Sequence, residues 1–159
     1  MLDRYDRQLL ALLQEDATQT TEGLAGQVPL SPSAIQRRLR RLREQGVIVR
    51  EIAVLDARKL GRCTSFVVSL RVDSEHPEPM TRLRAWLADE PRVQQAFYVT
   101  GEADFVLVVT APDTESYDAL MVRLMREHPV VRRFTTQVAL GVIKRGLTVP
   151  VPDPDDGTD

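Results

Sequence analysis

The sequence predicts an α+β protein with an N-terminal winged/helix-turn-helix domain of three helices and a C-terminal ferredoxin-like βαββαβ domain. The first observation behind this prediction is a series of capped segments with helical apolar spacing that ends at Gly46. The second is an alternation of short β-branched segments with helical ones, β-α-β twice over, between Phe66 and Val142. A polar stretch between the two regions, Asp56–Gly61, closes with glycine and marks the expected boundary.

The domain limits follow from these patterns. We expect a helix-turn-helix domain at residues 1–50, a hinge strand and linker at 51–61, a ferredoxin-like domain at 62–145 and a tail at 146–159. The tail combines proline with acidic residues, a composition that buries too little apolar surface to fold, so it is predicted to be disordered.

Two capped helices open the chain. Asp3 can cap the first of them. Its buried face is expected to hold Tyr5, Leu9, Leu12 and Leu13. Thr20-Thr21-Glu22, followed by Leu24, predicts a short second helix with an acidic residue in its first turn. Pro29-Leu30-Ser31 then predicts a tight connection, because proline ends one helix and serine caps the next.

The third helix is the most informative element. Ser31 can cap it, Pro32 suits its first position and Gly46 suits its end. Its apolar stripe is Ile35, Leu39 and Leu42. Opposite or beside that stripe lie Ser33, Gln36, Arg37, Arg38, Arg40, Arg41 and Arg43. A helix with five arginines on its polar side is suited to lie along a polyanion.

A helix, a tight turn and a basic helix together predict a DNA-binding helix-turn-helix whose second helix enters the major groove. The expected DNA-binding residues are Ser31, Ser33, Gln36, Arg37, Arg38, Arg40 and Arg41. The alternative is a solvated basic face on an ordinary bundle helix. The coincidence of helix pair, turn and basic face favours the DNA-binding interpretation.

Charge distribution agrees with this interpretation although the whole chain carries a net charge of −2. Residues 31–50 hold six arginines against one acidic residue, Glu44, whereas residues 62–159 carry a net charge of −4. Such asymmetry indicates a basic reading domain on an acidic body. A single cysteine, Cys63, excludes an intramolecular disulfide, and neither a signal peptide nor a membrane-length apolar run is present. We therefore expect a cytoplasmic protein.

The C-terminal half is expected to form a four-stranded antiparallel sheet with both helices on one face. The predicted strands are 66–72, 93–99, 105–109 and 130–142, and the predicted helices are 79–89 and 114–127. Because the strand segments are nearly continuous in apolar residues, both faces are expected to be buried, the second by another subunit. The β-branched segment Val47–Leu55 is expected to be a strand that pairs between subunits.

The order of these parts resembles the Lrp/AsnC (feast/famine) regulators over about residues 2–145. The residues that carry the resemblance are Leu2–Leu10, Leu30–Arg43, Gly46-Val47-Ile48, Lys59-Leu60-Gly61 and Gly101-Glu102-Ala103-Asp104. Two positions depart from the family pattern: Pro29 stands where a turn glycine is usual, and Arg50-Glu51-Ile52 replaces a common Gly-Tyr pair. The resemblance implies a dimer that assembles into tetramers or octamers, binds double-stranded DNA and senses an amino acid.

The effector site is predicted around the turn Gly101, Glu102, Ala103 and Asp104. A glycine turn can offer backbone N–H groups to a carboxylate, and Asp104 carries the charge that suits an α-ammonium. Thr135, Thr136 and Gln137 are unusually polar for their strand and could complete the pocket from the same or a neighbouring subunit. The resemblance implies that such positions contribute to sites between dimers. The alternative is a plain hairpin turn with a solvated Asp104.

An enzyme is the alternative from another class, because ferredoxin-like domains also host catalysts. The siroheme decarboxylases resemble this architecture, but they carry a His-Asn-Tyr segment where this chain has Ala96-Phe97-Tyr98. His76 and His128 each precede a proline, and no nucleophile triad or zinc-type ligand spacing is present. We expect no catalytic residue, metal site or cofactor. A third hypothesis is a DNA-organising protein without an effector.

Overall fold

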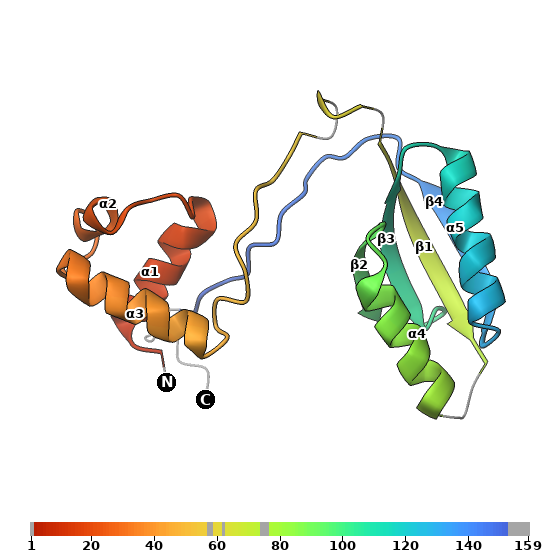
Figure 1. The fold of residues 1–159 in the computed structure, drawn as a ribbon, viewed down its shortest axis with the longest axis horizontal. Helices are drawn as coiled ribbons and strands as arrows, with labels where there is room; N and C mark the ends of the chain where they lie inside the picture. The colour runs from red at the N-terminus through yellow and green to blue at the C-terminus, as the bar shows by residue number, and fades with distance from the viewer. Residues whose placement is uncertain (1, 57–58, 62, 74–76, 153–159) are drawn as a thin grey trace. The chain divides into compact units, whose positions relative to one another are not determined.

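The computed structural model describes residues 2–56, 59–61, 63–73 and 77–152 of the chain (Figure 1). The chain divides into two compact units, each of which is described by itself. Unit 1 holds the residues up to Val54 and those from Gly146 onward, and unit 2 holds Leu55–Arg145. The α+β class and the two-part organisation predicted from the sequence are confirmed.

Unit 1 contains three helices. They are α1 (Arg4–Glu15), α2 (Thr21–Ala25) and α3 (Pro32–Glu44). The predicted caps of α1 and α3 are confirmed, and α2 is capped by Thr20: the side chains of Asp3, Thr20 and Ser31 accept a backbone N–H from the third residue after them. Beyond the C-terminal end of α3, Gly46 takes a φ of 70°, a left-handed conformation that glycine adopts without steric cost.

The core of unit 1 is built by one stripe from each helix and the turn between α2 and α3. Its fully buried members are Leu9, Leu24, Val28, Ile35, Leu39 and Leu42. The predicted stripe of α3 is therefore confirmed. Of the four apolar residues predicted to be buried on α1, Leu9 is buried completely, while Tyr5, Leu12 and Leu13 are half-buried against the same core. This packing fixes which side of α3 faces outward.

The predicted strand at Val47–Leu55 is not formed in the single chain. The described residues 49–56 carry no regular secondary structure, and Val49 and Val54 are largely exposed. β-branched residues favour a strand only where a neighbouring strand accepts the ladder hydrogen bonds, and no such ladder is present in this part of the described chain. The prediction that this segment pairs between subunits concerns a second chain and stays a prediction.

The C-terminal segment also differs from its prediction. Residues 146–152 belong to unit 1, where Gln14 of α1 holds Val149 by two hydrogen bonds, one to its carbonyl (3.0 Å) and one from its N–H (2.7 Å). Arg7 donates to the Pro152 carbonyl at 2.7 Å. The composition of 146–159 predicts a disordered tail, of which residues 153–159 lie outside the described residues. The Gln14 amide and the Arg7 guanidinium of α1 give the backbone of this segment partners that composition alone does not reveal.

Unit 2 follows the predicted βαββαβ order. Its elements are β1 (Thr64–Val72), α4 (Pro77–Asp89), β2 (Val93–Tyr98), β3 (Phe105–Ala111), α5 (Thr114–Glu127) and β4 (Val131–Val138). The strands form an antiparallel sheet in the order β2-β3-β1-β4, which confirms the ferredoxin-like fold. β4 ends at Val138 instead of the predicted Val142 because its partner β1 begins at Thr64. The N–H of Ala139 makes the last contact, to the Ser65 carbonyl.

Helices α4 and α5 pack against one face of this sheet (Figure 1). Side chains of β1 and β3 alternate between that buried face and an open face without helices. The open face carries Val67, Val106 and Val108, which are half-buried in the single chain, and the half-exposed Phe97. Apolar residues on both faces concealed this alternation in the sequence.

Candidate nucleic-acid interface and effector turn

The N-terminal end of α3 is fixed by its cap and by the buried turn before it. The Ser31 hydroxyl accepts the Ala34 N–H at 3.3 Å and lies 3.1 Å from the Ser33 hydroxyl. Val28, three residues before the cap, is buried and anchors the turn in the core of unit 1. Ser31 is therefore occupied as a cap, while Ser33 and Gln36 are exposed in the next turn of the helix.

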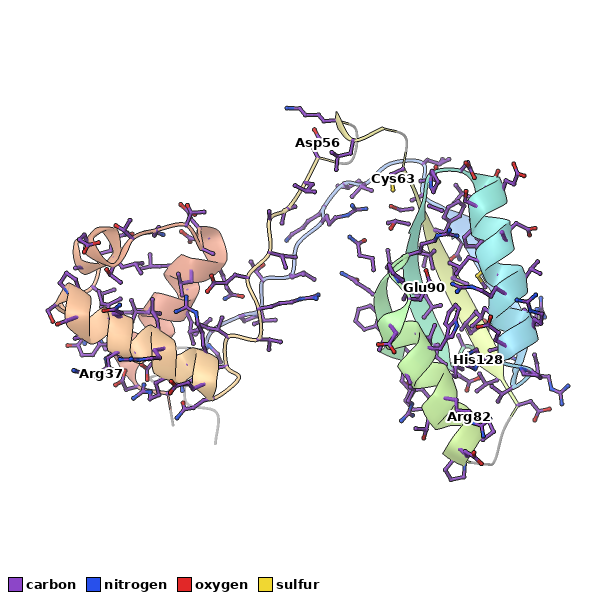
Figure 2. The ribbon with its side chains drawn as sticks, viewed as in Figure 1. Arg37, Asp56, Cys63, Arg82, Glu90 and His128 are labelled. Atoms are coloured by element: carbon purple, nitrogen blue, oxygen red, sulfur yellow. The ribbon has the colours of Figure 1, made fainter. Side chains whose placement is uncertain are left out.

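Two arginines of α3 are exposed and without an ion-pair partner among the described residues, Arg37 and Arg40. Figure 2 shows the Arg37 side chain projecting outward from α3. Together with Ser33 and Gln36 they form a polar strip at helical spacing, opposite the buried stripe. We call Ser33, Gln36, Arg37 and Arg40 the outer strip.

Two other arginines predicted to bind DNA turn toward α1 instead. Arg38 places Nη1 2.6 Å from Asp3 and 2.9 Å from Asp6, and Arg41 places Nη2 2.5 Å from Asp6. The ion pairs link α3 to the start of α1. A guanidinium held by a carboxylate in this way is less available to phosphate than a free one. The arginines predicted to bind DNA therefore separate into two groups, Arg37 with Arg40 and Arg38 with Arg41.

The pKa values of the α1–α3 contact reflect these bonds. The Asp6 N–H, donated to the Asp3 carboxylate, lowers the pKa of Asp3; burial opposes this effect and Arg38 adds to it. The hydrogen bonds from Arg38 to Asp3 and Asp6 raise the pKa of its guanidinium. Asp6 itself was not among the residues expected to matter. The signal that could have found it is the matching three-residue spacing of Asp3 and Asp6 on α1 and of Arg38 and Arg41 on α3.

The predicted effector turn joins β2 to β3 and is held by several hydrogen bonds. Gly101 has a φ of 118°, and the Val99 N–H donates to the Asp104 carbonyl at 2.9 Å. The Asp104 carboxylate accepts the Val72 N–H through Oδ2 at 2.9 Å, and Arg71 donates to the Glu102 carbonyl. Asp104 thus has a structural role at the end of β1. Its Oδ1 carries no hydrogen bond within the described part of the chain.

The polar residues of β4 divide between the two faces of the sheet. Thr136 faces α5, where its hydroxyl meets that of Tyr117, and burial raises the pKa of the Tyr117 hydroxyl against the opposing effect of this bond. Thr135 and Gln137 are exposed on the open face, opposite Ser69 and Val67. Only these two of the three β4 residues face away from the helices.

A single chain does not bring the turn and the β4 residues together. Thr136 lies level with Val68 and Leu107, three residues beyond Asp104 and two strands away from it. With strands ~4.8 Å apart and a rise of ~3.3 Å per residue, the separation is on the order of 14 Å. Within one chain, Thr136 and the turn therefore do not line a common pocket.

Comparison with known proteins identifies the class of this molecule. Residues 2–43 match the model of the AsnC-type helix-turn-helix domain, and residues 65–149 match that of the Lrp/AsnC ligand binding domain. The chain belongs to the Lrp/AsnC family of transcriptional regulators. The resemblance inferred from the sequence is confirmed, and the two matched regions of this Lrp/AsnC protein hold the outer strip and the turn at Gly101–Asp104.

Several relatives align with this Lrp/AsnC protein over almost its whole length. An uncharacterized HTH-type transcriptional regulator of Sinorhizobium fredii is 36% identical over 150 residues, 94% of this chain and 89% of the relative. The crystal structure of an AsnC family transcriptional regulator from Agrobacterium tumefaciens has a TM-score of 0.85 and 33% identity, covering 94% of this chain and 97% of that one. A Neisseria meningitidis transcriptional regulator solved as a complex with L-Met has a TM-score of 0.83 and 25% identity, with coverages of 94% and 97%.

The relatives bear on the enzyme alternative through their names, which are those of transcriptional regulators. The segment Ala96-Phe97-Tyr98, where the siroheme decarboxylases differ, lies on the edge strand β2. Phe97 stands opposite Val106, and the Tyr98 ring packs beside Phe105 under the Arg84 guanidinium, 4.8 Å away.

Among the helices of the described residues, none is long and apolar enough to span a membrane.

Proposed function

We propose that this Lrp/AsnC regulator binds specific double-stranded DNA through the outer strip of α3. The observation that carries the proposal is that Arg37 and Arg40 are exposed on the side of α3 opposite the core of unit 1, with no ion-pair partner in the part of the chain that the structure describes. A recognition helix contacts base edges with the residues of its N-terminal turns and phosphates with its cations. Ser33 and Gln36 are placed for the first task, and Arg37 and Arg40 for either.

Two copies of the chain are needed for tight binding, because one recognition helix contacts a short half-site. The open face of the unit 2 sheet supports a homodimer, since Val67, Val106, Val108 and Phe97 place apolar surface there without a helix to cover it. The extended segment at residues 49–55 supplies further backbone for pairing with a second copy. We propose that such dimers assemble further into tetramers or octamers.

An amino acid is the proposed effector. Oδ1 of Asp104 and the backbone of the Gly101 turn suit the α-ammonium and the carboxylate of such a ligand. We propose that Thr135 and Gln137 reach this turn from a neighbouring chain, since one chain keeps them apart. Thr136, with its hydroxyl bonded to Tyr117, serves this site only by supporting β4. The relative solved with L-Met makes L-methionine the first ligand to test.

The test begins with selection of a DNA site from a random duplex pool by the full-length protein. Affinity for the selected site is then measured with each of the twenty amino acids, beside a thermal-shift screen of the same ligands. A ligand that binds only the folded state at a hundred times its Kd adds about 2.7 kcal/mol of stability. We expect one or a few amino acids to raise the melting temperature and to change DNA affinity or assembly.

The same measurements, together with incubation of the protein with siroheme, separate the other hypotheses. DNA binding that no amino acid alters, without a thermal shift, identifies an effector-independent DNA-organising protein. Failure to select any DNA site contradicts the proposed regulator, and a spectral change on incubation with siroheme supports the enzyme. A regulator of genes works where the chromosome is, so we propose the cytoplasm as its compartment.

A further inference from the structure

A buried carboxylate of α1 connects the N-terminal end of unit 1 to the arginines of α3. The Asp6 side chain has no exposed surface. Its Oδ1 accepts from Arg38 at 2.9 Å, and its Oδ2 accepts from Arg41 at 2.5 Å and from the Asp3 N–H at 3.2 Å. Both carboxylate oxygens are thus used, in the reciprocal capping arrangement that Asp3 and Asp6 form at the start of α1.

The four central arginines of α3 fall into two pairs with the same three-residue spacing. Arg38 and Arg41 face the buried carboxylate, whereas Arg37 and Arg40 face outward. Positions three apart lie on the same side of a helix, so each pair shares one side. Neighbouring positions of a helix differ by a rotation of about 100°. One step along α3 therefore leads from an arginine that is open to a ligand to an arginine that is held by α1.

Ion pairing with the buried Asp6 carboxylate limits the contacts that Arg38 and Arg41 can make elsewhere. Side chains of Arg38 and Arg41 keep 22% and 44% of their surface exposed, so they remain near the outer surface of the domain. Their charge is balanced by Asp6, with Asp3 as a second partner of Arg38. To move to a phosphate either arginine must give up its bond to Asp6, which leaves this buried carboxylate with one guanidinium partner instead of two and is unfavourable.

We propose that Asp6 is a positioning residue of the DNA interface, which withholds Arg38 and Arg41 from phosphates and leaves Arg37 and Arg40 to make the contacts. The inference rests on the proposed function of α3. Its consequence is selectivity: fewer free cations reduce the sequence-independent attraction to DNA, while the base-reading residues are unaffected. A structural ion pair alone stabilises unit 1 and has no such effect on DNA binding.

The salt dependence of binding distinguishes these two roles. On B-DNA the slope of log K against log salt concentration is about −0.9 for each phosphate neutralised. In Asp6→Asn, Arg41 loses its carboxylate partner and Arg38 keeps only Asp3. The slope on a random-sequence duplex is therefore expected to steepen by about 1 for each bound chain, and by about 2 if Arg38 also reaches a phosphate. Affinity for that duplex at low salt is expected to rise several-fold. Discrimination between it and the selected site is expected to fall.

The experiment uses the full-length protein and fluorescence anisotropy on the random-sequence and selected duplexes over a range of salt concentrations. Glu15→Gln is the matched control, because it removes one exposed carboxylate from the same helix. A steeper slope in Asp6→Asn and an unchanged slope in Glu15→Gln support the inference. An unchanged slope in a folded Asp6→Asn overturns it and leaves Asp6 a structural residue.

A second pair of variants keeps the inference testable if Asp6→Asn does not fold. Arg41→Gln removes an arginine that the inference keeps off the DNA, so its slope is expected to equal that of the wild type. Arg40→Gln is expected to lose about 0.9 from the slope if it contacts one phosphate. Equal losses in the two variants overturn the inference. Absence of salt-dependent DNA binding in the wild type contradicts the proposed function itself, a result distinct from all of these.

Discussion

Single positions along α3 decide whether an arginine faces α1 or the solvent. Arg37 and Arg38 are neighbours in sequence, yet Arg38 contacts two carboxylates and Arg37 contacts none within the described chain. The helical rotation of about 100° between neighbours is the physical cause. A count of basic residues in this helix therefore overstates the number of guanidinium groups without an ion-pair partner among the described residues.

Replacement of Arg40 by alanine is expected to weaken DNA binding. A bidentate contact with a base predicts a loss of about 1–3 kcal/mol and an altered site preference. A phosphate contact predicts a similar loss on all sequences together with a shallower salt slope. The control is Arg132→Ala in unit 2, which removes the same charge from an exposed pair with Asp73. Wild-type affinity in both Arg37→Ala and Arg40→Ala contradicts the assignment of α3 as the recognition helix.

Asp104 combines a structural contact with a proposed ligand contact, and asparagine separates the two. In Asp104→Asn the amide oxygen still accepts the Val72 N–H, so the turn is expected to stay folded. Loss of the negative charge is expected to weaken binding of the best amino acid by about 1.5–3 kcal/mol, the range for a hydrogen bond to a charged group. Calorimetry measures the change. Undiminished binding by the folded variant places the effector site elsewhere.

At the scale of whole elements, two segments differ from what their own sequence predicts. The described residues 49–55 form no strand, and residues 146–152 lie against α1 through Gln14 and Arg7. The contact of residues 146–152 with α1 makes unit 1 discontinuous in sequence, because this last part of unit 1 follows the whole of unit 2. The described C-terminal segment is thus part of the DNA-binding unit.

Deletion of that segment is expected to loosen α1. A chain that ends at Arg145 loses the hydrogen bonds to Gln14 and Arg7, each with a net value of about 0.5–1.5 kcal/mol at most in such exposed positions. Hydrogen-exchange protection of the α1 amides is expected to fall, whereas protection in the sheet of unit 2 is expected to stay. A chain that ends at Pro152 retains these contacts and serves as the control. Equal protection in both truncated chains argues against a stabilising segment.

At the scale of the whole molecule, the proposed assembly depends on the open face of the unit 2 sheet. Val67 and Val108 are paired in neighbouring strands at its centre and are half-buried in one chain. Helices cover the opposite face, so this surface is the face of the sheet left for a second copy.

A charge on the open face is expected to separate the subunits. Val108→Asp adds a carboxylate where the sheet is half-exposed in one chain, so the monomer is expected to fold while its pairing is lost. Light scattering is expected to report 17.9 kDa for this variant and a multiple of it for the wild type. Val122→Asp, on the exposed side of α5, is the matched control and is expected to preserve the dimer. A wild-type protein that is monomeric at micromolar concentration contradicts the proposal.

The sequence by itself determined the helices of unit 1, the strand and helix order of unit 2 and the family. Caps at Asp3, Thr20 and Ser31 are local signals, and the stripe of Ile35, Leu39 and Leu42 follows from helical periodicity alone. Such features depend on residues a few positions apart, and they were therefore readable without any knowledge of the tertiary structure.

Only the tertiary structure decided which arginines are free and which segments have partners. Asp6 meets Arg38 and Arg41 from more than thirty residues away, and Gln14 meets Val149 across 135 positions. The end of β4 was likewise set by where β1 begins. These contacts depend on how distant segments pack. The sequence around a charged or β-branched residue does not indicate which partner the fold places beside it.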